Sequence, residues 1–231
     1  MIFHEMDLQT WNRREHFAHY TSQVPCFYSM CVDVDVTQLK KRGERLYPAL
    51  LYGLCAVANR HREFRMAFDG EGRLGWFEEI SPCYTVFHPE TETFSCLWTQ
   101  FSPDYREFCA RYQEDLRLYG AREGFWGKPH PPENLCDISM IPWRTFTGFH
   151  LDLPRGERHL LPIFTMGKVH EVQGKWLLPL AVQVHHGVCD GFHVCRFVEE
   201  LQQLLDRELY GAEGNMSVSY THLTLPTILR V

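Results

Sequence analysis

The chain alternates between helical and strand-like hydrophobic periods, with no internal repeat and no linker rich in glycine, serine or proline. Residues 45–61 are apolar on most sides but too short to cross a membrane, so they predict a buried helix. A shorter helix is predicted near residues 10–20, with Thr10 as its N-cap. Another is predicted to open at Ser102 and Pro103. Its apolar positions recur at spacings of three and four: Tyr105, Phe108, Cys109, Tyr112 and Leu116.

Strand-like patterns occupy much of the remaining chain. Residues 84–101 are rich in β-branched and aromatic residues around a polar centre, which predicts a strand, a turn and a second strand. Glycines and prolines predict a loop over residues 124–134. Three further runs predict the centre of a sheet: residues 147–153, 160–172 and 175–186. A turn at Gln173 and Gly174 is predicted to join the last two.

The stretch VQVHHGVCDGFHV, residues 182–194, lies where the last strand-like run meets a helical pattern, and such loops often carry chemistry. Its polar side chains allow three interpretations. A metal site has suitable ligand types, but adjacent histidines on a strand point to opposite faces and no standard zinc spacing is present. A structural cluster of hydrogen-bonded groups is the second. The third is a general base with an acid four residues later, in a turn set by Gly191. The candidate residues are His185, His186, Cys189, Asp190 and His193.

Composition narrows the classes of function. The 231 residues, 45% of them hydrophobic, are enough for one sizeable core. A net charge of −6 with scattered basic residues gives no reason to expect a nucleic-acid partner. No stretch reaches the roughly 18 apolar residues that span a bilayer. Nine cysteines without a Cys-x-x-Cys pair favour reduced thiols. A cytoplasmic protein with no membrane partner is therefore expected.

His185-His186-Gly187-Val188-Cys189-Asp190-Gly191 resembles the His-His-x-x-x-Asp-Gly signature of the coenzyme-A-dependent acyltransferase superfamily, and in particular the chloramphenicol acetyltransferase family. Further blocks resemble that family in the same order, and together they cover nearly all of residues 3–209: residues 11–29, 87–95, 138–143, 162–168 and 178–202. The resemblance implies an α/β fold, an α+β two-layer sandwich in which helices cover a mixed β-sheet. It implies one acetyltransferase domain over residues 1–211. The rest, 212–231, is predicted to be a non-native or disordered tail, since 217–231 has no helical stripe and no family counterpart.

The resemblance also implies roles for the residues of the motif. His186 would be the general base and His185 would point into the structure. Asp190, supported by Gly191, would pair with Arg13 and hold the loop without touching substrate. If that pair is buried, removing one partner is expected to cost about 3–5 kcal/mol.

Three further residues match family positions. Ser139 would donate a hydrogen bond to the oxyanion that forms when a hydroxyl attacks the acetyl thioester. Thr165 would assist the same site through water, and Trp143 would lie near the pantetheine arm of the coenzyme. Without the resemblance, a serine at the end of a strand is more often a turn or capping residue.

An aromatic and apolar acceptor pocket is implied, with Phe125 or Trp126 nearby. The residues at its lining positions are Tyr20, Val24, Cys26, Tyr28, Phe94, Cys96 and Leu151. Tyr28 stands where the family usually has phenylalanine, and His19 precedes Tyr20, so the pocket gains polar groups. The family further implies a homotrimer with active sites at the subunit interfaces.

The activity implied is transfer of acetyl from acetyl-coenzyme A, a co-substrate, to the primary hydroxyl of chloramphenicol, which confers antibiotic resistance. It needs no bound cofactor and no metal. Direct attack in a ternary complex is expected, because the chain has no Gly-x-Ser-x-Gly elbow for a serine nucleophile. Two alternatives remain: the same machinery acting on another hydroxyl acceptor, and a catalytically silent binding trimer.

Overall fold

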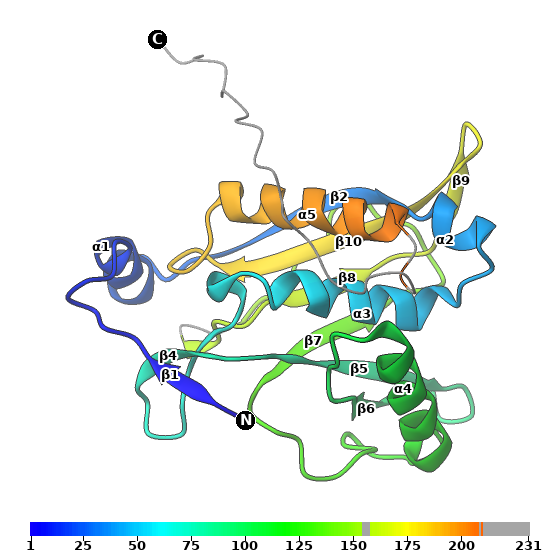
Figure 1. The fold of residues 1–231 in the computed structure, drawn as a ribbon, viewed down its shortest axis with the longest axis horizontal. Helices are drawn as coiled ribbons and strands as arrows, with labels where there is room; N and C mark the ends of the chain where they lie inside the picture. The colour runs from blue at the N-terminus through cyan, green and yellow to red at the C-terminus, as the bar shows by residue number, and fades with distance from the viewer. Residues whose placement is uncertain (154–157, 208, 210–231) are drawn as a thin grey trace.

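A mixed β-sheet forms the centre of the computed structural model, which describes residues 1–153, 158–207 and 209 (Figure 1). The strands lie in the order β2-β10-β8-β7-β5-β6, and β9 pairs with β10. Strand β10 is antiparallel to both of its neighbours β2 and β8, whereas β7 is parallel to β5 and β8. The bounds are β2 (Phe27–Asp35), β5 (Ser81–His88), β6 (Thr93–Trp98), β7 (Leu135–Met140), β8 (Ile163–Met166), β9 (His170–Val172) and β10 (Lys175–His185).

Helices α3 (Leu46–Ala58) and α5 (Gly191–Asp206) lie side by side along the sheet (Figure 1). Their approach is close at Gly53, where an added Cβ would lie 3.2 Å from a methyl carbon of Leu201. Below them, Phe197 of α5 stacks on Phe164 of β8 with ring centroids 5.2 Å apart. The predicted buried helix over residues 45–61 is confirmed, since most of α3 is inaccessible to solvent. The apolar faces of the helices and of the sheet therefore make one core.

Smaller elements complete the described structure. Helix α4 (Tyr105–Tyr119) packs beside β6, and α2 (Thr37–Lys41) lies near α5 and β10. A second sheet has the order β1-β4-β3, from β1 (Phe3–Glu5), β3 (Met66–Phe68) and β4 (Leu74–Phe77). A short 3₁₀ helix, η2 (Arg62–Phe64), precedes β3. Among the described residues no helix is both long and apolar enough to span a membrane.

Two predicted helix starts were wrong. Thr10 does not cap a helix, because its hydroxyl donates to the Asp7 carboxylate at 2.9 Å. The chain becomes helical only at α1 (Arg14–Ala18), and a π-helical turn, η1 (His19–Gln23), follows it. Helix α4 begins after Asp104 rather than at Ser102. The Asp104 side chain accepts the Glu107 N–H at 2.9 Å, which is the usual N-cap contact.

The strand predicted over residues 147–153 is also absent from that part of the chain. Its backbone groups pair with side chains instead. The Leu151 N–H donates to the Gln183 amide oxygen at 2.8 Å, and the Phe149 N–H donates to the Cys31 sulfur at 3.2 Å. Pairing with side chains satisfies the backbone without a strand ladder.

The other predicted strands are present, and the turn at Gln173 and Gly174 is confirmed, with φ values of 52° and 79°. Two consecutive positive φ angles are typical of a type I′ hairpin turn. The predicted tail, residues 212–231, lies outside the described residues.

Candidate active site

The motif HHGVCDG forms a tight loop between β10 and α5. The His186 N–H donates to the Cys26 carbonyl at 2.9 Å, which prolongs the pairing of β10 with the chain before β2. The chain then turns, and the N–H groups of Val188 and Cys189 both donate to the His185 carbonyl at 3.0 Å. These contacts determine where the two histidines point.

His185 points into the core, as predicted. Its side chain is fully buried, and its Nδ1 accepts the Gly187 N–H at 2.9 Å. Burial, with the adjacent His186, lowers the pKa of His185 to about 4, so its ring is neutral near pH 7. A neutral Nδ1 is what the Gly187 N–H requires, and His185 therefore acts as a structural acceptor.

The His186 ring is held between two tyrosines. Its plane stacks on Tyr20 with centroids 4.0 Å apart and 12° between planes, and the Tyr28 ring meets it at 68° and 5.3 Å. The side chain is 30% exposed. Its Nδ1 is buried 3.4 Å from Asp190 Oδ1, which leaves Nε2 as the nitrogen available to a ligand. The tyrosines orient the ring, and the exposed fraction keeps it accessible.

Arg13 clamps the loop from the residue before α1. Its guanidinium binds both carboxylate oxygens of Asp190, and it also donates to the carbonyls of His186 at 3.1 Å and Gly187 at 3.3 Å. The hydrogen bonds from Arg13 hold the pKa of Asp190 below its ordinary value. The Arg13 and Asp190 side chains are 17% and 39% exposed, so the pair is not fully buried. The condition for a cost of about 3–5 kcal/mol, a buried pair, is therefore not met, and a smaller cost is expected.

The structure gives Gly191 a role different from the predicted one, and it shows the contact by which His193 supports the loop. Gly191 is the first residue of α5, its φ is not positive, and an added Cβ would meet nothing within 4 Å. The expectation that its backbone freedom sets the turn was wrong. His193, two residues later, accepts the Asp190 N–H on Nδ1 at 2.9 Å. An acid followed three residues later by an acceptor is the pattern of a capping box, a signal present in the sequence.

Ser139 and Thr165 lie on neighbouring strands and form a hydroxyl pair. They are direct partners in the parallel register of β7 and β8, and their side-chain oxygens are 3.2 Å apart. Thr165 is 2% exposed, while Ser139 is half-buried. Either hydroxyl can donate to the other, so one proton remains for a ligand.

The hydroxyl pair and His186 do not meet within one chain. Thr165 is the register partner of Ala181, five residues before His186 on β10. At about 3.4 Å per residue this is a separation of about 17 Å along the strand, and Ser139 lies one strand further away. Such a gap exceeds the reach of both side chains.

The predicted acceptor residues do not lie together within one chain. Tyr20, Cys26 and Tyr28 surround His186, and Val24 follows η1 as an exposed residue. Burial raises the pKa of Tyr28, and within the described part of the chain its buried hydroxyl has no hydrogen-bond partner. The others lie elsewhere: Phe94 and Cys96 on β6, and Leu151 beside Gln183.

Exposed aromatic rings lie around β5 and β6. Trp143, the predicted coenzyme residue, packs its exposed ring against Phe87 at 5.0 Å, and Phe94 packs against Phe125 at 6.2 Å. Trp126 contacts Phe125 at 5.2 Å. Large exposed rings in contact with one another are typical of binding surfaces.

Among the residues that the structure describes, no group of three or more His, Cys, Asp or Glu side chains is placed to hold a metal ion.

Comparison with known proteins identifies the family. The family model described as chloramphenicol acetyltransferase matches residues 1–202. The chain belongs to the chloramphenicol acetyltransferase family. Relatives with that name include one from Campylobacter coli, 55% identical, and one from Clostridium perfringens, 53% identical. The alignments cover 90% and 89% of this chain and all of each relative. The family predicted from the motif is confirmed.

Solved structures give the same fold. A chloramphenicol acetyltransferase structure superposes with a TM-score of 0.75 at 24% identity, covering 88% of this chain and all of the other. A dihydrolipoamide acetyltransferase from Azotobacter vinelandii gives a TM-score of 0.59 at 15% identity, over 83% of this chain and 86% of that one. The predicted fold, a mixed sheet covered by helices, is confirmed.

Proposed function

We propose that the chain transfers acetyl from acetyl-coenzyme A to the primary hydroxyl of chloramphenicol, with His186 as general base. The observation that carries this is the His186 ring, held between Tyr20 and Tyr28 with Nε2 free for a substrate, in a chain 55% identical to a relative named chloramphenicol acetyltransferase. Acetyl-coenzyme A acts as co-substrate, in the cytoplasm, and the reaction confers resistance on a host.

The reaction needs a proton acceptor and a stabilised oxyanion. Nε2 of His186 removes the hydroxyl proton as the acceptor oxygen attacks the thioester carbonyl, so no free alkoxide forms. The carbonyl oxygen becomes an oxyanion, and the Ser139 hydroxyl donates to it, oriented by Thr165 at 3.2 Å. When the C–S bond breaks, the imidazolium returns its proton to the coenzyme thiolate. Both substrates are bound together, and no acyl-enzyme forms.

A homotrimer with its active sites between subunits accounts for the separation of the two parts of the proposed site, His186 and the Ser139–Thr165 hydroxyl pair. His186 with Tyr20, Cys26 and Tyr28 would form one wall, and the hydroxyl pair of a second copy the other. The separation of about 17 Å along β10 within one chain supports this arrangement. Phe94, Cys96, Leu151 and Trp143 would then line acceptor and coenzyme surfaces from the second copy. The exposed aromatic rings around β5 and β6 support a surface that a partner covers.

A thiol-release assay tests the proposal. Acetyl-coenzyme A is supplied with and without chloramphenicol to the wild type, His186→Ala and His16→Ala, in which an exposed histidine of α1 is the control. Chloramphenicol-dependent thiol release is expected in the wild type and the control, and a loss of about 10²–10⁴-fold in His186→Ala. Release only with another hydroxyl compound would favour a different acceptor. No release with any acceptor would favour the silent binding trimer.

A further inference from the structure

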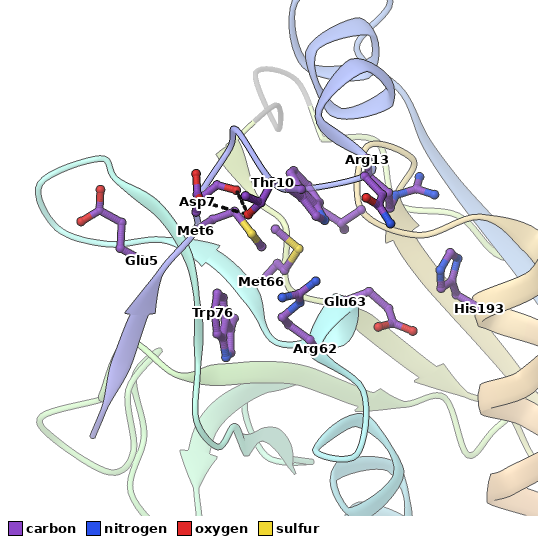
Figure 2. A pocket seen from close by; sticks show the side chains of 13 residues that line it. Glu5, Met6, Asp7, Thr10, Arg13, Arg62, Glu63, Met66, Trp76 and His193 are labelled. Carbon is purple, nitrogen blue, oxygen red and sulfur yellow. Dashed lines mark hydrogen bonds between the residues drawn. The ribbon is translucent and has the colours of Figure 1, made fainter.

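His193 lies behind the loop that carries His186, on the wall of a separate cavity. The cavity has a volume of about 430 Å³, and its lining includes Arg13, Val188 and, from η2, Arg62 and Glu63. Figure 2 shows the His193 ring beside the start of α5, on the same wall as Arg13. The imidazole therefore faces a cavity whose lining includes none of Tyr20, Cys26 and Tyr28, the residues around His186.

The hydrogen bond at His193 requires one protonation state. Nδ1 accepts the Asp190 N–H at 2.9 Å, so the neutral ring carries its proton on Nε2. A proton added to Nδ1 would place two N–H groups face to face and remove the bond. Asp190 is the residue whose carboxylate holds Arg13, and Arg13 holds the His186 and Gly187 carbonyls. The His186 and Gly187 carbonyls of the loop are thus linked to the His193 ring by three successive contacts, through Arg13 and Asp190.

The charges around His193 nearly cancel. Asp190 is paired with Arg13, and Glu63 of η2 is paired with Arg196 of α5. Two carboxylates and two guanidiniums contribute no net charge, so desolvation decides, and burial lowers the pKa of His193. The remaining charged groups on the cavity wall are exposed: Glu5, Asp7 and Arg62, the last over the Trp76 ring at 5.1 Å.

We propose that His193 is a positioning residue whose neutral imidazole fixes Asp190 and whose protonation loosens the Arg13 clamp and slows acetyl transfer. This inference rests on the proposed role of His186. It makes acetyl transfer depend on a protonation that takes place away from the substrate.

The test compares kcat as a function of pH in the wild type, His193→Gln, His193→Ala and the control His16→Gln. Glutamine at this helix position accepts the same N–H without titrating, so kcat of His193→Gln at pH 7.5 is expected within about threefold of the wild type. Alanine, which cannot accept, should lower it about tenfold. The ratio of wild-type to His193→Gln kcat should fall as the pH is lowered below 6.5, since any pH dependence common to the two proteins cancels in that ratio. A constant ratio, or wild-type kcat in His193→Ala, overturns the proposal.

Ring ¹⁵N shifts of labelled histidine in the full chain, with His193→Gln identifying the resonance, provide a readout that needs no catalysis. The Nε2–H tautomer is expected at pH 7.5, and an Nδ1–H or doubly protonated ring overturns the proposal. If the tautomer is as expected but no variant or wild type acetylates chloramphenicol, the proposed function fails and the Asp190–His193 contact stands.

Discussion

The Arg13 guanidinium binds the Asp190 carboxylate with two hydrogen bonds across 177 residues of sequence. The same guanidinium also donates to the carbonyls of His186 and Gly187. One side chain therefore joins the start of α1 to the loop that presents the proposed base. The paired charges are part-exposed, so the contact matters more for the shape of the loop than for overall stability.

Arg13→Lys should reduce activity more than stability. Lysine keeps the charge but has no planar fork, so it cannot hold the carboxylate and the two carbonyls together. We expect the free energy of unfolding to fall by about 1–2 kcal/mol and kcat to fall about tenfold or more. Urea unfolding and thiol release measure the two quantities.

A double-mutant cycle with Asp190→Asn separates the pair from its surroundings. In the free energy of unfolding, the two substitutions should be coupled by about 0.5–3 kcal/mol, because the two groups are in contact. The exposed Arg14, the next residue along, provides a control as Arg14→Lys. Additive effects of Arg13→Lys and Asp190→Asn would contradict the clamp.

Stability should fall as the pH drops from 6.5 towards 4, because of His185. The pKa of this ring is lowered from 6.5 to about 4 in the fold, so between these values the unfolded chain binds the additional proton. The contribution of neutral His185 to the free energy of unfolding is fully present above pH 6.5. About 3 kcal/mol of it is lost by pH 4. Urea unfolding at several pH values measures it.

His185→Asn isolates that contribution. The asparagine oxygen can accept the Gly187 N–H in place of Nδ1, but it does not titrate in this range. The slope of unfolding free energy against pH should therefore decrease by one proton. Some slope should remain, since burial also lowers the pKa values of His159 and His193. An unchanged slope would show that His185 is not the titrating group.

Ser139→Ala should lower kcat about 10²–10³-fold with little change in KM for either substrate, as expected for loss of an oxyanion donor. Thr165→Val keeps the volume of the neighbouring side chain and removes only its hydroxyl, so its effect should be smaller. Steady-state kinetics distinguish the two. A loss seen mainly in KM would make Ser139 a ground-state binding residue instead.

Two inactive variants should restore activity when they are mixed in one assembly. In a trimer with sites between copies, co-expressed Ser139→Ala and His186→Ala chains would form intact sites at about a quarter of the interfaces. The double variant Ser139→Ala/His186→Ala, expressed alone, is the control. Mixed assemblies as inactive as that control would place both residues of a site in one chain.

Local sequence patterns predicted the elements that rest on local physics. The buried helix α3, the hairpin of β5 and β6 and the turn at Gln173 and Gly174 agree with the structure because periodicity and turn chemistry act over a few residues. Thr10 does not cap a helix because its hydroxyl donates a hydrogen bond to the Asp7 carboxylate. Residues 147–153 do not form a strand because their backbone N–H groups donate to the side chains of Cys31 and Gln183, which are distant in sequence. In both places, hydrogen bonds to other side chains replaced the hydrogen bonds of the predicted helix cap and strand.

By itself the sequence determined the family, through the motif around His186 and through further blocks that follow the order of the family. The family in turn indicated which residues of this chain are candidates for the site. Only the tertiary structure decided how those residues are arranged. It showed His193, rather than Gly191, supporting Asp190, and it placed Ser139 and His186 apart on one sheet. The contact between Asp190 and His193 follows a local pattern, but strand register pairs residues that are remote along the chain, such as Ser139 with Thr165 and Thr165 with Ala181. No local pattern encodes that pairing, and this is the physical reason why only the tertiary structure decided it.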